Sequence, residues 1–168
     1  MRWKALVAAV LVVVLGFGLY WFAPWRLFTD TTVNESLTTA TATATATTTA
    51  TAPATLVRSG EFVTHEHDTS GRASIVRTAD GVHHLEIEGL DTSDGPDLRV
   101  WLTDQTVVAG KAGWRVFDDG TWVELGKLKG NKGNQVYEIP STADLTALRS
   151  VTIWCKRFAV SFGAAQLA

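Results

Sequence analysis

Residues 73–88 read Ala-Ser-Ile-Val-Arg-Thr-Ala-Asp-Gly-Val-His-His-Leu-Glu-Ile-Glu, and this stretch decides the fold class. Short runs of alternating apolar and polar residues lie on both sides of Asp80-Gly81, as expected for strands with one buried face. Asp-Gly is a frequent two-residue hairpin turn, because glycine readily adopts the positive φ that the turn needs. The stretch therefore predicts an antiparallel β-hairpin.

The same pattern continues from about Leu56 to the end of the chain, with turn signals between the runs. One segment, 142–148 after Pro140, is a candidate for a short helix. About 110 residues with seven or eight short strands predict an all-β domain over 56–168, built as an antiparallel β-sandwich or a barrel-like sheet. The expected strands are 60–64, 73–77, 82–88, 98–103, 122–128, 135–139, 151–154 and 158–162.

Residues 5–23 form an apolar run without charge. At about 1.5 Å of rise per residue such a helix spans roughly 28 Å, the thickness of a bilayer core. An aromatic cluster at 20–25 follows, which is typical of the bilayer interface, and a small-x-small cleavage site does not. The sequence therefore predicts an uncleaved N-terminal membrane anchor over 1–27, in preference to a cleaved signal peptide.

The charges that flank the anchor predict its orientation. Arg2 and Lys4 precede the apolar run and only Arg26 closely follows it. The positive-inside rule then leaves the N-terminus in the cytoplasm. We expect a single-pass cell-membrane protein whose C-terminal domain is extracytoplasmic.

Residues 28–55 are predicted to form a disordered linker. From Thr38 to Thr55 the chain is almost only threonine and alanine, which offer too little apolar surface to offset the entropy of ordering. Such a tract is compatible with an O-glycosylated stalk and with a plain flexible spacer, and both alternatives stay open.

The formal charge of −2 and the lack of a Lys/Arg-rich stripe give no reason to expect a nucleic-acid partner. No phosphate loop, nucleophile elbow or HExxH motif is present, so hydrolase functions have little support. The chain holds a single cysteine and therefore no internal disulfide. The fold must rest on its hydrophobic core.

That single cysteine, Cys155, is the first candidate for chemistry. Alternation in the run 151–155 places it on the same face as Val151 and Ile153, which is the expected core face. A buried thiol is either an inert small apolar group or a tuned redox group. Lys156 and Arg157 follow directly, and they would lower the thiol pKa if their side chains turned toward the sulfur.

The histidines are the candidate metal ligands. His65 and His67 are two residues apart, so in a strand they share a face and form a two-ligand edge for copper, zinc or haem iron. His83 shares an apolar face with Leu85, and either His65 or His83 would make a mixed nitrogen and sulfur site if it met Cys155. The alternative for each histidine is a hydrogen-bonded core position.

Two further groups of residues have both a structural and a functional interpretation. The acidic turn at 91–97 is either an ordinary Asx-type turn or a calcium site that uses Asp94 and Asp97. The tryptophans of the domain are either core residues or the lining for a flat apolar ligand. These tryptophans are Trp101, Trp114, Trp122 and Trp154.

Three stretches in order resemble the DM-thirteen domain family. They are Gly-Pro-Asp-Leu-Arg-Val-Trp-Leu at 95–102, Leu-Gly-Lys-Leu-Lys-Gly-Asn at 125–131 with its continuation to Pro140, and Trp-Cys-Lys-Arg-Phe at 154–158. His67-x-Thr-Ser-Gly near the start is similar to the opening hairpin of that family. The resemblance covers nearly all of 56–167, whereas the anchor and the linker lie outside it.

The resemblance implies an extracytoplasmic all-β domain that takes part in electron transfer or thiol redox chemistry through its characteristic cysteine. In this chain that residue is Cys155, acting as a free thiol or as a ligand to a prosthetic group such as haem or a metal ion. A redox partner protein is implied, because a lone thiol needs a partner for its electrons. We therefore expect an electron-transfer component rather than a stand-alone enzyme. The alternatives are a stalk-displayed binding or adhesion module in which Cys155 only packs, and a calcium-stabilised structural domain.

Overall fold

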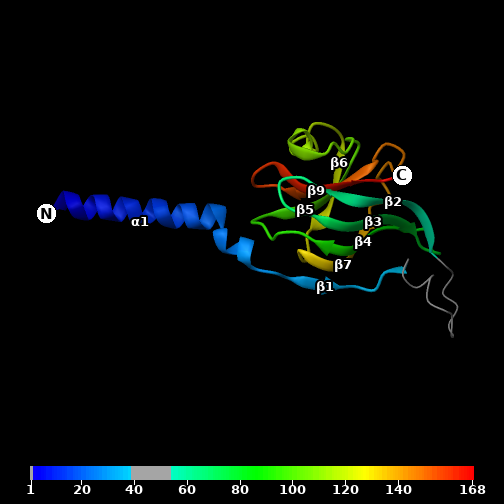
Figure 1. Ribbon diagram of the computed structural model, residues 1–168, viewed down its shortest axis with the longest axis horizontal. Coiled ribbons are helices and arrows are strands. Elements are labelled where there is room, and N and C mark those ends of the chain that lie inside the picture. The colour runs from blue at the N-terminus through cyan, green and yellow to red at the C-terminus, as the bar shows by residue number, and fades with distance from the viewer. Residues whose placement is uncertain (1, 39–53) are drawn as a thin grey trace.

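The computed structural model describes residues 2–38 and 54–168 (Figure 1). A long N-terminal helix, α1 (Arg2–Phe22), projects from a strand-rich domain, with a short 3-10 helix, η1 (Pro24–Phe28), between them. Most of the predicted Thr/Ala-rich stalk, residues 39–53, lies outside the described residues.

α1 is long and apolar enough to cross a membrane. The span Trp3–Arg26 has 24 residues, and none of its most apolar window is buried inside the protein. The helix ends at Phe22, and the next residue, Ala23, adopts the left-handed conformation with φ of 43° immediately before Pro24. A residue before proline is disfavoured in the helical region, so the chain turns at this point. Which end of α1 faces the cytoplasm stays a prediction from the flanking charges.

In the described residues the strands form one sheet in the order β1-β7-β4-β3-β2-β9-β8-β5-β6. All neighbouring pairs are antiparallel except β1 and β7, which run parallel. A short 3-10 helix, η2 (Gly110–Gly113), lies in the connection between β5 and β6. The strands are β1 (Thr32–Asn34), β2 (Thr55–Thr64), β3 (Ser70–Arg77), β4 (His83–Asp91), β5 (Leu98–Thr103), β6 (Trp122–Lys127), β7 (Lys132–Ile139), β8 (Ser150–Cys155) and β9 (Val160–Gln166).

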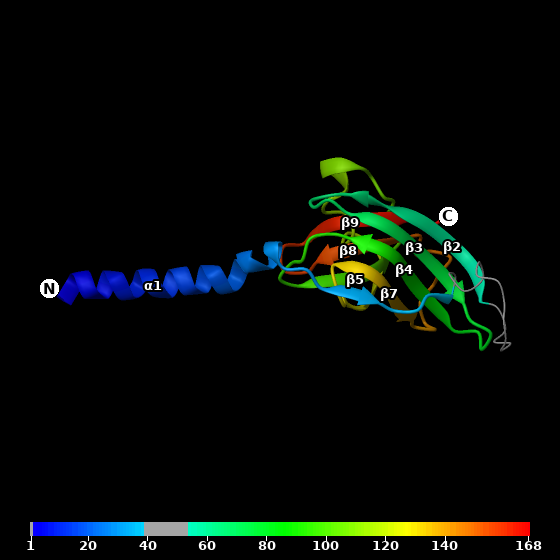
Figure 2. The same cartoon turned by 60° about the horizontal axis from the view of Figure 1, so that its bottom comes forward.

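The sheet curls into a half-barrel, as Figure 2 shows. Its curl brings β6 close to β7, where the Tyr137 hydroxyl donates a 3.3 Å hydrogen bond to the carbonyl oxygen of Lys127. The concave side holds one hydrophobic core to which seven of the nine strands contribute buried side chains. The all-β prediction is confirmed, and the barrel-like alternative describes the architecture.

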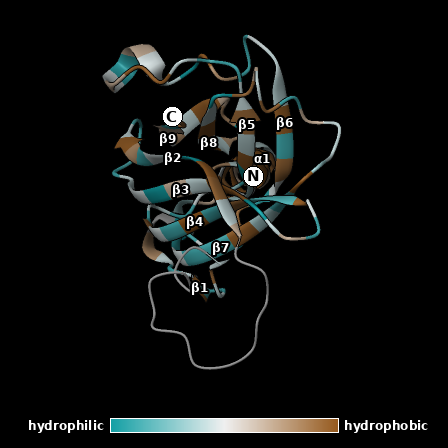
Figure 3. Cartoon of the chain, turned by 90° about the vertical axis from the view of Figure 1, so that its right-hand side faces the viewer, coloured by the Kyte–Doolittle hydropathy of each residue, from teal (hydrophilic) through white to brown (hydrophobic). Residues whose placement is uncertain are grey.

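The predicted hairpin at Asp80-Gly81 joins β3 to β4, with Arg77 opposite His83. Gly81 adopts φ of 88°, which a residue with a side chain rarely does. Apolar residues of this hairpin such as Ile75 and Leu85 are fully buried in the core. Figure 3 shows the hydrophilic and hydrophobic residues interspersed along the strands, as alternation across a half-buried sheet requires.

Two segments differ from the sequence-based expectation. Residues 142–148 form turns instead of a helix, in which the Asp144 carbonyl accepts hydrogen bonds from the amides of Ala147 and Leu148 and the Asp144 side chain bonds Thr146. A single turn closed by an aspartate side chain competes with helix propagation.

The second difference is β1, which lies within the range predicted to be linker. Its three residues pair with β7, and Glu35 just beyond it receives a 2.8 Å bond from the Lys129 ammonium group. β1 is ordered because it pairs with β7, which lies far from it in the sequence. Local composition does not reveal such pairing. The limits 1–27, 28–55 and 56–168 stay a prediction of the domain organisation.

Candidate functional site around Cys155

Cys155 is the last residue of β8, and its side chain is completely buried in the core together with Val151 and Ile153. The predicted core face of this strand is therefore confirmed. Leu98 on β5 and Val160 on β9 are its neighbours across the two strand pairs. The sulfur consequently sits at the edge of the core, where β8 ends and the turn to β9 begins.

Burial raises the pKa of the Cys155 thiol above its ordinary value of 9.0, and the negative charge of Glu66 acts in the same direction. Backbone hydrogen bonds from Phe158, Arg157 and Asp97 oppose this rise without cancelling it. The thiol is therefore protonated at neutral pH. Backbone amides around a cysteine sulfur are also found at electron-transfer centres, where they adjust the reduction potential.

The two cations that follow Cys155 are directed away from the sulfur. The Lys156 ammonium group lies 3.4 Å from a carboxylate oxygen of Glu124. The Arg157 guanidinium donates hydrogen bonds to the carbonyl oxygens of Trp21 at 2.6 Å and Tyr20 at 3.3 Å. Both side chains are therefore engaged elsewhere, and the arrangement in which they would lower the thiol pKa is not formed.

Arg157 instead caps the carboxyl end of α1. The last carbonyls of a helix lack partners within the helix, and a cation there also interacts favourably with the helix dipole. The guanidinium carbon lies 5.3 Å from the ring centroid of Trp21, and Phe158 stacks on Phe22 with centroids 5.7 Å apart. The turn 156–159, which covers Cys155, therefore also holds the end of the predicted membrane helix.

The same turn is fixed from the domain side by Arg115. Its guanidinium donates hydrogen bonds to the carbonyl oxygens of Phe158 at 3.1 Å and Ala159 at 3.2 Å. Ala159 has φ of 49°, a left-handed conformation that costs a residue with a side chain about 1 kcal/mol. The turn 156–159 thus contains one strained residue, Ala159. It is held by Arg115 from the domain and by the bonds of Arg157 to α1.

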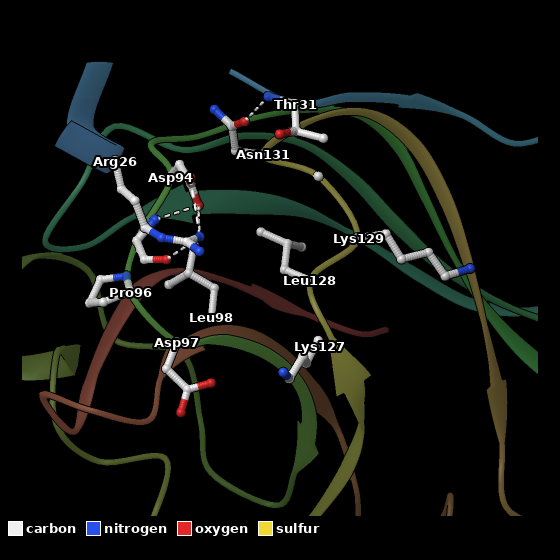
Figure 4. Close-up of a pocket in the computed structure, with 12 residues that line it drawn as sticks. Arg26, Thr31, Asp94, Pro96, Asp97, Leu98, Lys127, Leu128, Lys129 and Asn131 are labelled. Carbon is white, nitrogen blue, oxygen red and sulfur yellow. Dashed lines mark hydrogen bonds and ion pairs between the residues drawn. The ribbon is translucent and has the colours of Figure 1, made fainter. Parts of the chain in front are cut away.

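A cavity of about 170 Å³ lies beside the Cys155 site, between the loops at 94–98 and 127–131 (Figure 4). Leu98, which is paired with Cys155, and Leu128 face each other from its two walls, and Arg26 covers one end. Both loops belong to the stretches that carry the family resemblance. Leu98 therefore belongs both to the lining of the cavity and to the strand pair that holds Cys155.

Two buried amide side chains shape this cavity. Asn131 accepts a 2.7 Å bond from the amide of Thr31 and donates 2.8 Å bonds to Asp30 and to the carbonyl of Thr92. Gln135 holds the loop at 127–131 through its backbone groups. Sequence reasoning missed both residues, although their position in the Lys-Gly-Asn-Lys-Gly-Asn-Gln run within the family-like stretch is a signal that could have identified them.

The acidic turn at 91–97 is engaged with protein cations. Asp94 pairs with Arg26 at 3.3 Å and Asp97 pairs with Arg99 at 2.8 Å. Asp94 also accepts a 2.7 Å bond from the amide of Gly95, which is the expected behaviour of an Asx-type turn. The calcium hypothesis receives no support from these contacts.

His65 and His67 follow the end of β2, and their rings face different sides of β9. His65 is buried, with Nδ1 2.8 Å from the Ser161 hydroxyl and Nε2 3.1 Å from the carbonyl oxygen of Val108. Burial lowers the pKa of His65, so this imidazole is neutral. His67 lies on Phe162, the next residue along β9, with ring centroids 4.0 Å apart. Successive strand residues point to opposite faces, so the two imidazoles are not brought to one edge.

His83 begins β4 and is partly buried at the end of the strand away from Cys155. In the described part of the chain, no group of three His, Cys, Asp or Glu side chains is placed to hold a metal ion. Within these residues Cys155 is therefore not part of a three-ligand metal site. Ligand roles for His65, His67 and His83 stay predictions, and no step below is built on them.

Alkaline pH is expected to destabilise the fold through Tyr137 and Cys155. Burial raises the pKa of Tyr137 from 10.0 to about 12 and also raises that of Cys155 from 9.0. Each raised pKa contributes stability that is complete below the ordinary value and is lost as the pH rises through the folded-state value. Two pKa units correspond to about 2.7 kcal/mol, so the free energy of unfolding should fall by roughly this amount between pH 10 and 12.

Urea unfolding at a series of pH values measures this effect. Tyr137→Phe is the matched control, because it keeps the buried ring and removes the ionisation. The variant should lose much less stability over the same interval. An equal alkaline loss in both proteins would assign the effect to other groups.

Comparison with known proteins gives the family. No curated protein and no solved structure matches the chain. Residues 61–167 match the family described as Electron transfer DM13. This range includes Cys155, the turn 156–159, the two loops at 94–98 and 127–131 that line the cavity, and the strands from Glu61 in β2 onward. The chain therefore belongs to the DM13 electron-transfer family.

Proposed function

We propose that this protein is a membrane-tethered, extracytoplasmic component that passes single electrons through Cys155 to and from a redox partner protein. Membership of the electron-transfer family and a helix long enough to cross a membrane support the general role. The complete burial of the Cys155 side chain is the main support for electron transfer over thiol–disulfide exchange.

Burial separates the two kinds of reaction that a lone cysteine offers. Thiol–disulfide exchange needs a thiolate in direct contact with the sulfur of its partner. Cys155 is protonated and covered by the turn 156–159, so neither condition is met in this structure. Electron transfer needs no contact, because an electron tunnels across short distances of packed protein. The geometry therefore favours one-electron chemistry over exchange.

The step balances as a proton-coupled oxidation. A one-electron acceptor on the partner takes one electron from the Cys155 thiol, the S–H bond breaks, and a thiyl radical remains. The thiol proton is released to bulk water. Return of one electron and one proton restores the thiol.

The test compares an alkylating reagent, which must contact the sulfur, with a one-electron oxidant, which need not. Full-length protein in detergent is treated with iodoacetamide, or with photogenerated tris(bipyridine)ruthenium(III) as an outer-sphere one-electron oxidant. We expect alkylation to be at least about 100-fold slower than in the urea-unfolded chain, equivalent to roughly 3 kcal/mol for opening the turn. The oxidant should nevertheless consume the thiol of the folded protein.

Cys155→Ser is the control for both arms, because it removes the sulfur and keeps a small side chain. Rapid alkylation of the folded protein would favour exchange chemistry over electron transfer. A folded thiol that resists both reagents would leave Cys155 a packing residue and would support the binding or adhesion module instead.

A further inference from the structure

A buried redox group needs a path to the surface, and three tryptophans provide one. Trp122 on β6 stacks on Trp101 on β5 with ring centroids 4.0 Å apart and planes inclined by 5°. Trp101 stacks on Trp154 on β8 at 5.2 Å and 28°. Trp154 is the chain neighbour of Cys155. The stack therefore leads across three neighbouring strands to the residue beside the sulfur.

The two ends of the stack differ in exposure. Trp122 is 39% exposed, whereas Trp101 and Trp154 are 3% and 1% exposed. Trp101 and Trp154 belong to a cluster separate from the main core, on the face of β8 opposite to Cys155. The stacked rings thus connect the partly exposed Trp122 to the buried Trp154.

The middle ring has a proton acceptor. The Trp101 Nε1–H donates a 3.3 Å hydrogen bond to Glu124, whose carboxylate also pairs with Arg99 at 2.8 Å and Lys156 at 3.4 Å. An indole that loses an electron becomes a strong N–H acid. A carboxylate on that nitrogen takes the proton and returns it when the electron is replaced. Packing alone requires neither this bond nor the near-parallel rings.

We propose that Trp122, Trp101 and Trp154 form an electron-hopping relay between a one-electron redox partner at the Trp122 surface and Cys155. This inference rests on the proposed function of Cys155. It names the surface at which the partner acts and the residues through which the electron travels.

Each hop moves one electron. The acceptor on the partner oxidises Trp122, and Trp101 replaces the missing electron while its Nε1 proton moves to Glu124. Trp154 then reduces Trp101, which recovers the proton, and Cys155 reduces Trp154. The net change is one electron from Cys155 to the partner and one thiol proton released, with the three tryptophans unchanged.

The test uses full-length protein and the same photogenerated ruthenium(III) oxidant. Transient absorption follows the tryptophyl radicals, and thiol titration after unfolding follows the loss of Cys155. Trp101→Phe keeps an aromatic ring that is much harder to oxidise, and Trp122→Phe does the same at the surface, where folding is least affected. Both should slow Cys155 loss at least about tenfold.

Trp114→Phe is the matched control, because Trp114 lies in the same domain outside the stack. It should leave the rate of Cys155 loss unchanged. Glu124→Gln removes the proton acceptor and should shift the transient spectrum from the neutral tryptophyl radical toward the radical cation. Unchanged Cys155 loss in both stack variants would overturn the relay while leaving the redox role of Cys155 intact.

Cys155→Ser separates failure of the relay from failure of the proposed function. If Cys155 supplies the electron, the tryptophyl radical should outlive that of the unaltered protein, because its donor is missing. Equal radical lifetimes, together with an intact thiol in the unaltered protein, would refute the role of Cys155 itself.

Discussion

Gln135→Leu is expected to lower the free energy of unfolding by about 2 to 5 kcal/mol, because the buried amide and carbonyl of Gly130 lose the side chain that they bond. The Gln135 Oε1 accepts bonds from the amides of Lys129 at 3.1 Å and Gly130 at 3.3 Å, and its Nε2 donates a 2.7 Å bond to the carbonyl of Gly130. The side chain is fully buried, so water cannot replace these bonds in the folded state. Leucine has a similar volume, and the loss therefore reports the polar contacts rather than a cavity.

Urea unfolding followed by tryptophan fluorescence measures this change. Gln105→Leu is the matched control, since Gln105 is only partly buried and its side chain makes one bond, to Asp104. It should cost less than about 1 kcal/mol. Equal losses for the two variants would mean that Gln135 does not organise the loop. A structure of Gln135→Leu should also show the cavity beside Leu98 altered in shape.

Gly60→Ala is expected to have the second large effect, a loss of about 3 kcal/mol or more. A Cβ atom at Gly60 would lie 1.9 Å from the carbonyl oxygen and 2.8 Å from the carbonyl carbon of Gln166. These are backbone atoms of β9 at the place where β2 joins it, so no side chain can rotate out of the way. The neighbouring amides of Ser59 and Ala168 each donate a 3.1 Å bond to the carbonyl of the other, and this exchange would have to break.

Gly89→Ala is the comparison for that prediction. Gly89 has φ of 57° but open space around its Cα, so alanine there suffers only the left-handed backbone cost of about 1 to 2 kcal/mol. The difference between the two variants isolates the clash at the junction of β2 and β9. A Gly60→Ala protein with the stability of Gly89→Ala would show that the junction adapts.

The features that were predicted correctly from the sequence depend on residues that are close together in the chain. The Asp80-Gly81 turn and the alternation around it specified the hairpin of β3 and β4. The same alternation placed Cys155 on the face of β8 that carries Val151 and Ile153, which is the face of the main core. The charge-free run before Pro24 likewise identified α1 from its length and composition.

The features that the sequence did not predict depend on pairing between distant strands. The stack of Trp122, Trp101 and Trp154 exists because β6, β5 and β8 are adjacent in the sheet, and no local spacing contains that order. Similarly, β9 was predicted to begin at Phe158 but begins at Val160, because Ala159 adopts a left-handed conformation. An alanine in a sequence gives no indication of such a conformation.

The candidate site also combines a feature that local sequence predicts with one that depends on distant residues. Sequence reasoning found Cys155, but it left open whether Lys156 and Arg157 turn toward the sulfur. Arg157 is drawn instead to the carbonyls of Tyr20 and Trp21, which lie more than 130 positions earlier in the chain. Such a long-range bond appears only when the anchor and the domain are placed together in space.

The contact between Arg157 and α1 couples the position of that helix to the turn 156–159. A helix that spans a bilayer tilts in response to a thinner or thicker membrane. A tilt of α1 would move the carbonyls that Arg157 bonds and so displace the turn 156–159. If α1 spans a membrane, the thickness of that membrane would then bear on how firmly the turn 156–159 is held over Cys155.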